Sequence, residues 1–224
     1  MPLLSHPFLY SPPADPWLSP VHVDDDLLIL NKPSGLLTVP GKTPDLADCL
    51  EARAMAEWPG ARIVHRLDMD TSGILVMARN PAAQRHLGHQ FERRQMQKRY
   101  IARVEGVLEP REGVVDLPLR CDWPNRPLQM VCHENGRASL TEWRVIGREI
   151  GARGREATRV ALMPKTGRSH QLRVHMLALG HPILGDSFYG DRTSAPRLQL
   201  HAKTLRMRHP SGGAWVEFTA RCPF

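Results

Sequence analysis

Between Ile63 and Ala78 the chain reads IVHRLDMDTSGILVMA, a polar turn with carboxylates and basic groups between two apolar runs. The β-branched pair at 63–64 and the apolar run at 74–77 are typical of buried strands, and the Thr-Ser-Gly at 71–73 is typical of a turn. The polar side chains therefore lie where strands end. Because loop residues held by a rigid scaffold often carry chemistry, Asp68 is our candidate nucleophile.

The stretch HRLD at 65–68, followed by TSG at 71–73, closely resembles the catalytic motif of the RluA family of pseudouridine synthases. Four further blocks resemble motifs of the same family and stand in the family's order: NKPSGL at 31–36, KRY at 98–100, GRSHQLRVH at 167–175 and GHPILGD at 180–186. Several independent blocks in one order argue against a chance match. The resemblance extends from about Val21 to the C-terminus.

The resemblance implies an α+β fold with a central, mostly antiparallel β-sheet, split by a catalytic cleft and flanked by a few helices. The sequence pattern agrees, because many β-patterns follow Lys98 and few helices interrupt them, which does not fit a regular βαβ repeat. A strand-turn-strand pattern spans 21–39, and helices are predicted at 45–58, at 81–93 after an Asn80 cap, and from about Ser169 to Gly180. We expect a proline-rich arm at 1–20 and one catalytic domain at 21–224.

The composition suits an RNA partner. The 224 residues carry 30 Lys and Arg against 23 Asp and Glu, a formal charge of +7, although such an excess also occurs in proteins that bind no nucleic acid. The four cysteines form no C-x-x-C pair, so neither a disulfide framework nor a metal site is expected. Without a signal peptide or a long apolar run, we expect a cytoplasmic monomer that does not enter a membrane.

Pseudouridine formation breaks the N1–C1′ bond of a uridine within RNA, turns the uracil and joins C5 to C1′, with no cofactor. Asp68 could attack C1′ or add at C6 of the base, and the sequence leaves both routes open. By resemblance, Arg168 is the cation paired with Asp68, and Tyr100 lies against the target base. Because the pKa of an ordinary tyrosine is near 10, we expect Tyr100 to stack on the base and not to transfer a proton. An Arg66 side chain could fill the space of a flipped base. The predicted substrate-binding residues are His65, Arg66, Lys32, Thr71, His170 and Arg173.

Three alternative interpretations of the site stay open. A paired-carboxylate mechanism would use Asp70 with Asp68, but two acids in one turn need not face one substrate, so we expect Asp70 to be a turn or surface group. A non-catalytic RNA-binding module would explain the charge but not the motifs, and a nucleoside hydrolase would release free uracil.

The segment 120–137 looks like an inserted loop with basic residues and an aromatic Trp123, typical of a surface hairpin or of a contact to unpaired RNA.

The substrate prediction rests on resemblance within the family. The segment LQMVC at 128–132 and the ending HMLALGHP at 175–182 resemble the compact, dual-specificity type that acts on 23S rRNA and tRNA anticodon stem-loops. Other subgroups share much of this, so the same reaction at a different tRNA or rRNA site is the alternative. We expect recognition of a short RNA stem-loop by the catalytic domain itself.

Overall fold

The main feature of the protein is one ten-stranded sheet. The computed structural model describes residues 9–151 and 154–224. Its strands run in the order β1-β2-β4-β11-β5-β10-β9-β6, with β3 also paired to β4 and β12 to β11. The strand bounds are β1 Pro20–Val23, β2 Leu27–Lys32, β3 Arg62–Ile63, β4 Ser72–Ala78, β5 Gln97–Glu105, β6 Glu112–Asp116, β9 Leu140–Ile150, β10 Glu156–Pro164, β11 Leu200–Arg208 and β12 Trp215–Thr219. A separate two-stranded sheet holds β7 Leu119–Cys121 and β8 Gln129–Val131.

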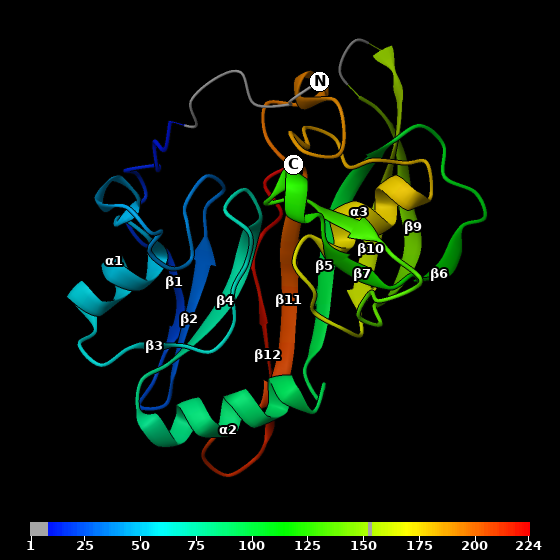
Figure 1. Ribbon diagram of the computed structural model, residues 1–224. Coiled ribbons are helices and arrows are strands. Elements are labelled where there is room, and N and C mark those ends of the chain that lie inside the picture. Colours follow the sequence, from blue (N-terminus) through cyan, green and yellow to red (C-terminus); the bar gives the residue numbers. More distant parts are fainter. Residues whose placement is uncertain (1–8, 152–153) are drawn as a thin grey trace.

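The two halves of the sheet meet at β4 and β11 (Figure 1). Within the described residues this pair is parallel and the other pairs in the sheet are antiparallel, which confirms the expected mostly antiparallel sheet. Gly73 sits in this junction with φ +115°, and a Cβ on it would lie 2.3 Å from the carbonyl oxygen of Ala202. Only glycine fits there, because the backbones of the two strands approach too closely for a side chain.

In the described ranges, three α-helices flank the sheet, α1 Leu50–Glu57, α2 Pro81–Glu92 and α3 Gln171–Ala178. Short 3₁₀ helices occur as η1 Pro44–Leu46, η2 Trp123–Asn125 and η4 Arg192–Ser194. The prediction of α2 was accurate, since Asn80 Oδ1 accepts a hydrogen bond from the Ala83 N–H at 2.8 Å and Pro81 opens the helix. No helix in the described part of the chain has the length and apolar character needed to cross a membrane.

Two predicted elements were wrong in extent. The helix expected at 45–58 is split, because η1 ends at Leu46 and α1 starts only after Cys49, whose Sγ accepts the Ala52 N–H at 3.4 Å. The strand expected at 36–39 is irregular backbone. Its apolar pattern arises because Leu36 packs in the core and Thr38 is buried against the loop that carries Asp68.

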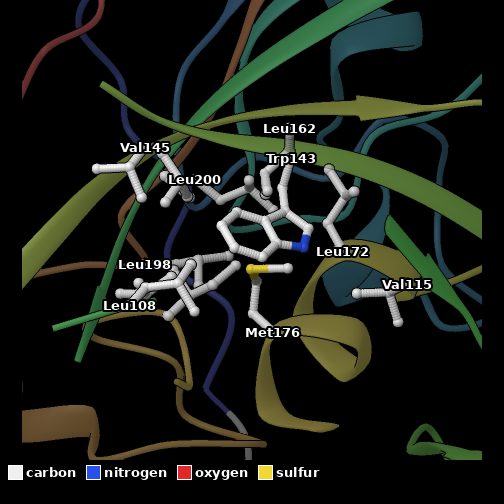
Figure 2. Packing of buried hydrophobic residues seen from close by; sticks show 13 residues of the cluster. Leu108, Val115, Trp143, Val145, Leu162, Leu172, Met176, Leu198 and Leu200 are labelled. Carbon is white, nitrogen blue, oxygen red and sulfur yellow. The ribbon is translucent and has the colours of Figure 1, made fainter. Parts of the chain in front are cut away.

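Among the residues that the structure describes, the buried apolar side chains form three clusters. One joins α1 to β2 and β4, a second joins α2 to β2, β4 and β11, and the third lies between α3 and the strands β5, β9 and β10. Figure 2 shows the third cluster, where the indole of Trp143 packs among Leu162, Leu172 and Met176. Tyr100 packs against both the first and the third of these clusters, so it stands at the junction between the two halves of the sheet.

The described part of the N-terminal arm lies against α1. The Arg53 guanidinium donates to the carbonyls of Pro13 at 2.8 Å and Trp17 at 3.2 Å, and it stacks on the Trp17 ring at 4.2 Å. The Tyr10 hydroxyl donates to the Asp48 carbonyl at 2.7 Å. Residues 1–8 of the predicted arm lie outside the described residues.

Candidate active site

Asp68 lies in the loop between β3 and β4, as expected, at the centre of the sheet. Its carbonyl accepts the Thr71 N–H at 3.1 Å, and the Thr38 hydroxyl donates to the carbonyl of the preceding Leu67 at 2.7 Å. The Asp68 side chain keeps 29% of its surface exposed. The backbone is thus fixed on both sides of a carboxylate that a substrate can reach.

Lys32 is buried under the Asp68 loop and holds it by hydrogen bonds. The residue is 0% exposed, and its Nζ donates to the carbonyls of Pro33 at 2.9 Å, Leu36 at 2.6 Å and Met69 at 2.7 Å. Burial lowers its pKa to about 7, against the charges of Asp70 and Asp68. The prediction that Lys32 contacts substrate is therefore wrong, because its amino group is buried and hydrogen-bonds the loop after β2 to the loop that carries Asp68.

Thr71 is buried, and His65 is partly buried with both ring contacts made inside the protein. Thr71 is 2% exposed, too little for the predicted substrate contact. The Nε2 of His65 accepts the Val76 N–H at 3.1 Å, and its ring stacks on Phe91 with centroids 4.6 Å apart. Burial, and then the charge of Lys98, lower the pKa of His65 to about 3. His65 is thus a neutral ring whose Nε2 is used by the backbone of β4.

The cation beside Asp68 is Arg173, on α3. Its Nη1 lies 3.7 Å from Asp68 Oδ2. On its other side the guanidinium makes a bidentate pair with Asp186, at 2.8 Å from Nε and 2.6 Å from Nη2. Arg173 is 2% exposed and Asp186 is 0% exposed. Burial alone would lower the pKa of Arg173, but the hydrogen bonds and charge of Asp186 outweigh it and raise that pKa.

Arg168 does not make the predicted ion pair with Asp68. Its Nε donates to the Ala138 carbonyl at 3.3 Å, from a partly exposed position before α3. The motif at 167–175 holds two arginines, and the helix turns the second one, Arg173, toward Asp68. Arg66 lies in the same loop as Asp68 and is exposed, and its predicted role remains a prediction.

His170 precedes α3 and reaches the same site from the other side. Its backbone is left-handed, with φ 53° and ψ 15°, a sparsely populated region for a residue with a side chain. The Tyr189 hydroxyl accepts the Gln129 N–H at 2.8 Å and is hydrogen-bonded to His170 Nδ1, 2.7 Å away. Burial lowers the pKa of His170 and raises the pKa of Tyr189 to about 12. Both rings are thus neutral near pH 7.

Three site residues escaped the sequence analysis: Asp186, Phe188 and Tyr189. The rings of Phe188 and Tyr189 lie 5.0 and 5.1 Å from the Arg173 guanidinium, and Asp186 Oδ1 accepts the N–H groups of both residues at 2.9 and 3.1 Å. The available signal was the acid at the end of the block at 180–186. A carboxylate that is buried with such apolar neighbours needs a buried partner.

Tyr100 projects from β5 at the junction of the two halves. Burial, and then the negative charge of Asp68, raise the pKa of Tyr100 far above its usual value near 10. The phenol therefore stays protonated, which favours the expected stacking role over that of a base. Asp70 is partly buried, and burial raises the pKa of its carboxyl despite the nearby charges of Arg173 and Lys32.

The comparisons with known proteins agree with this geometry. Residues 26–178, more than half of the chain, match the sequence model described as RNA pseudouridylate synthase. The chain belongs to the RNA pseudouridylate synthase family. The family's activity, isomerisation of uridine to pseudouridine within RNA, confirms the enzyme class expected from the motifs, and the family's fold confirms the expected architecture.

Similar proteins cover nearly the whole chain. Proteins named dual-specificity RNA pseudouridine synthase RluA from Escherichia coli and Vibrio vulnificus are each 52% identical over 96% of this chain, covering 98% and 87% of those relatives. Among solved structures, human RNA pseudouridylate synthase domain containing 1 matches with a TM-score of 0.78 and 32% identity, over 99% of this chain and 87% of that one. Human RNA pseudouridylate synthase domain containing 4 matches with a TM-score of 0.69 and 25% identity, over 92% and 88% of the two chains.

Proposed function

We propose that this pseudouridine synthase uses the Asp68 carboxylate as its nucleophile. The observation that carries the proposal is the position of Asp68: a partly exposed carboxylate, fixed at a strand end, with the buried Arg173 guanidinium 3.7 Å away. A nucleophile needs to be both reachable and held in one orientation. Arg173 supplies the orientation, because Asp186 holds it on the opposite side and so keeps it from swinging toward solvent.

The surrounding groups support a covalent or addition route. If Asp68 attacks C1′, its Oδ–C1′ bond forms as N1–C1′ breaks and the electron pair leaves with the uracil. After the base turns, C5 bonds to C1′, Asp68 leaves, C5 loses its proton and N1 gains one. If Asp68 adds at C6, the same carboxylate is needed. In both routes the protonated Tyr100 offers its ring face to the base, and Arg173 balances the charge of Asp68.

We further propose that the substrates are a 23S rRNA site and a tRNA anticodon stem-loop. The support is the 52% identity to relatives named dual-specificity RNA pseudouridine synthases, spread over nearly the full length of both chains. We also propose that the protein works in the cytoplasm, where its cysteines remain reduced; all four are free thiols in the structure.

The substrate proposal is tested by mapping pseudouridine in total rRNA and tRNA from cells with and without this gene. Loss confined to large-subunit rRNA and anticodon-loop sites is expected. Loss only in small-subunit rRNA, or only at unrelated tRNA positions, would contradict it. In parallel, purified enzyme should modify an isolated anticodon stem-loop; modification of full-length rRNA alone would refute recognition of a compact hairpin.

A further inference from the structure

The hairpin β7–β8 is not part of the main sheet, yet it is joined to the active site. Figure 1 shows it beside α3. The Gln129 N–H of β8 donates to the Tyr189 hydroxyl, and that ring lies against the Arg173 guanidinium. The base of the hairpin is closed by the Cys132 N–H, which donates to the Pro118 carbonyl at 2.9 Å. The β7–β8 hairpin is therefore attached to the protein next to the candidate catalytic residues.

The tip of the β7–β8 hairpin, residues 122–128, carries an exposed aromatic residue on a preformed turn. Trp123 is 67% exposed, an unusual position for an indole. The Asp122 N–H donates to the Leu128 carbonyl at 2.9 Å, and the Asn125 side chain donates to Asp122 Oδ2 at 2.9 Å. The tip is thus ordered by its own hydrogen bonds before any partner binds, which reduces the entropy that binding costs.

A guanidinium already covers part of the Trp123 ring. The Arg126 Cζ lies 4.4 Å from the ring centroid. Since two-thirds of the residue is still exposed, a second flat group has room on the indole. The hairpin segment 119–137 carries three arginines against one Asp and one Glu, and the Asp is engaged with Asn125. A flat, partly cationic surface of this kind fits an unpaired nucleobase with its phosphate.

We propose that Trp123 and Arg126 form a base-stacking platform for an unpaired nucleotide of the substrate loop, next to the target uridine. This inference rests on the proposed function and deepens it, because it assigns the hairpin a specific contact to single-stranded RNA. One nucleobase stacks on Trp123, and Arg126 holds the indole in place and faces the backbone phosphate. Stacking on an aromatic tolerates different bases, which suits an enzyme with more than one RNA substrate.

The chain contains a matched control. Trp215 on β12 is 38% exposed and lies under Arg208 at 4.4 Å and Arg206 at 4.9 Å. It is the same kind of Trp–Arg cluster, but it lies on strands of the main sheet and has no hydrogen-bonded link to Tyr189 within the described residues. Trp215→Ala should leave RNA binding within about twofold, since exposed single contacts away from an interface contribute little.

The test compares Trp123→Ala, Trp123→Phe and Trp215→Ala on one anticodon stem-loop RNA. We expect Trp123→Ala to raise the Kd and the KM about 5- to 150-fold, the usual range for one lost base stack, with kcat within about twofold of the parent enzyme. Trp123→Phe should recover most of the affinity. Circular dichroism checks folding, and Arg126→Ala, which leaves the indole in place, gives a second and smaller loss of affinity.

Abasic nucleotides identify the stacked base. Each loop nucleotide next to the target is replaced in turn, and affinity is measured with the parent enzyme and with Trp123→Ala. One position should weaken the parent enzyme and have no further effect in Trp123→Ala. Equal affinity of parent and Trp123→Ala, or losses that simply add at every position, would overturn the platform. Absence of pseudouridine formation by the parent enzyme on this RNA would instead refute the proposed function.

Discussion

Asp186→Asn is the substitution that tests how Arg173 is held beside Asp68. The Asp186 carboxylate is 0% exposed and accepts four hydrogen bonds, two from the Arg173 guanidinium and two from backbone N–H groups. The amide has the same shape and can keep the backbone bonds through Oδ1. Its NH₂ group, however, would face the Arg173 Nε–H, donor against donor.

The cost of this change follows from the buried charge that it leaves. Removing one partner of a buried ion pair typically costs about 3–5 kcal/mol, because the remaining charge is uncompensated. Against a total stability of about 5–15 kcal/mol for a domain, this loss is large. The freed Arg173 would also pair more closely with Asp68, now its nearest carboxylate, so kcat should fall by about tenfold or more even at a temperature where the protein stays folded.

Urea unfolding of Asp186→Asn, Arg173→Met and the double variant measures the pair directly. The double variant should lose less stability than the sum of the single variants, since each single change strands the other group. Glu112→Gln is the matched control, because Glu112 pairs with Arg144 at 3.2 Å and both side chains are about two-thirds exposed. It should change the unfolding free energy by less than about 1 kcal/mol. A loss below about 1 kcal/mol for Asp186→Asn, or full additivity, would refute the reasoning.

Three further predictions concern the stability of the fold. Gly73→Ala should prevent stable folding, measured by thermal denaturation, because its Cβ would lie 2.3 Å from a β11 carbonyl oxygen, whereas Gly88→Ala in α2, with nothing within 4 Å, should add about 0.5–1 kcal/mol; two variants of equal Tm would contradict this. Lys32→Met removes the donor for three buried or partly buried carbonyls and should cost about 3 kcal/mol or more in urea unfolding, and an unchanged midpoint would contradict the role of Lys32 in joining the two loops. Burial alone would lower the pKa of His209, but its hydrogen bond to Asp24, 3.1 Å away, raises it. The stabilisation is thus present below the unfolded pKa near 6.5 and is lost as the pH rises through the raised value, so His209→Gln should cost up to about 1 kcal/mol at pH 6 and less at pH 9; the reverse order would contradict the pairing.

Local patterns identified the parts of the fold that local chemistry determines. The cap and proline at the start of α2 lie next to each other in the sequence, and the apolar run of β4 is buried on both faces. The strand expected at 36–39 was wrong, because an apolar pattern indicates that side chains are buried but does not determine whether the backbone is a strand or irregular. The late start of α1 has a similar origin, since the cap there is a cysteine, a weak signal for a helix start.

The site was predicted only as far as its position in the chain. The motifs indicated Asp68 and Tyr100, whose roles remain proposals, and they indicated Arg168 for the position beside Asp68 that Arg173 occupies. Two arginines five residues apart on a loop and a helix point in different directions, and the deciding partner, Asp186, comes from a later loop. Lys32 and Thr71 were taken for substrate ligands because a sequence does not show that a polar side chain is buried.

The most direct measurement is single-turnover pseudouridine formation by Asp68→Asn on a stem-loop RNA, with the Kd measured on the same protein. Loss of the nucleophile should reduce the rate by about a thousandfold or more and leave the Kd within about threefold. Asp70→Asn, two residues away, should stay active, because burial already disfavours charge at Asp70. An Asp68→Asn protein that forms pseudouridine at more than about a tenth of the parent rate would contradict the assignment of Asp68 as the nucleophile.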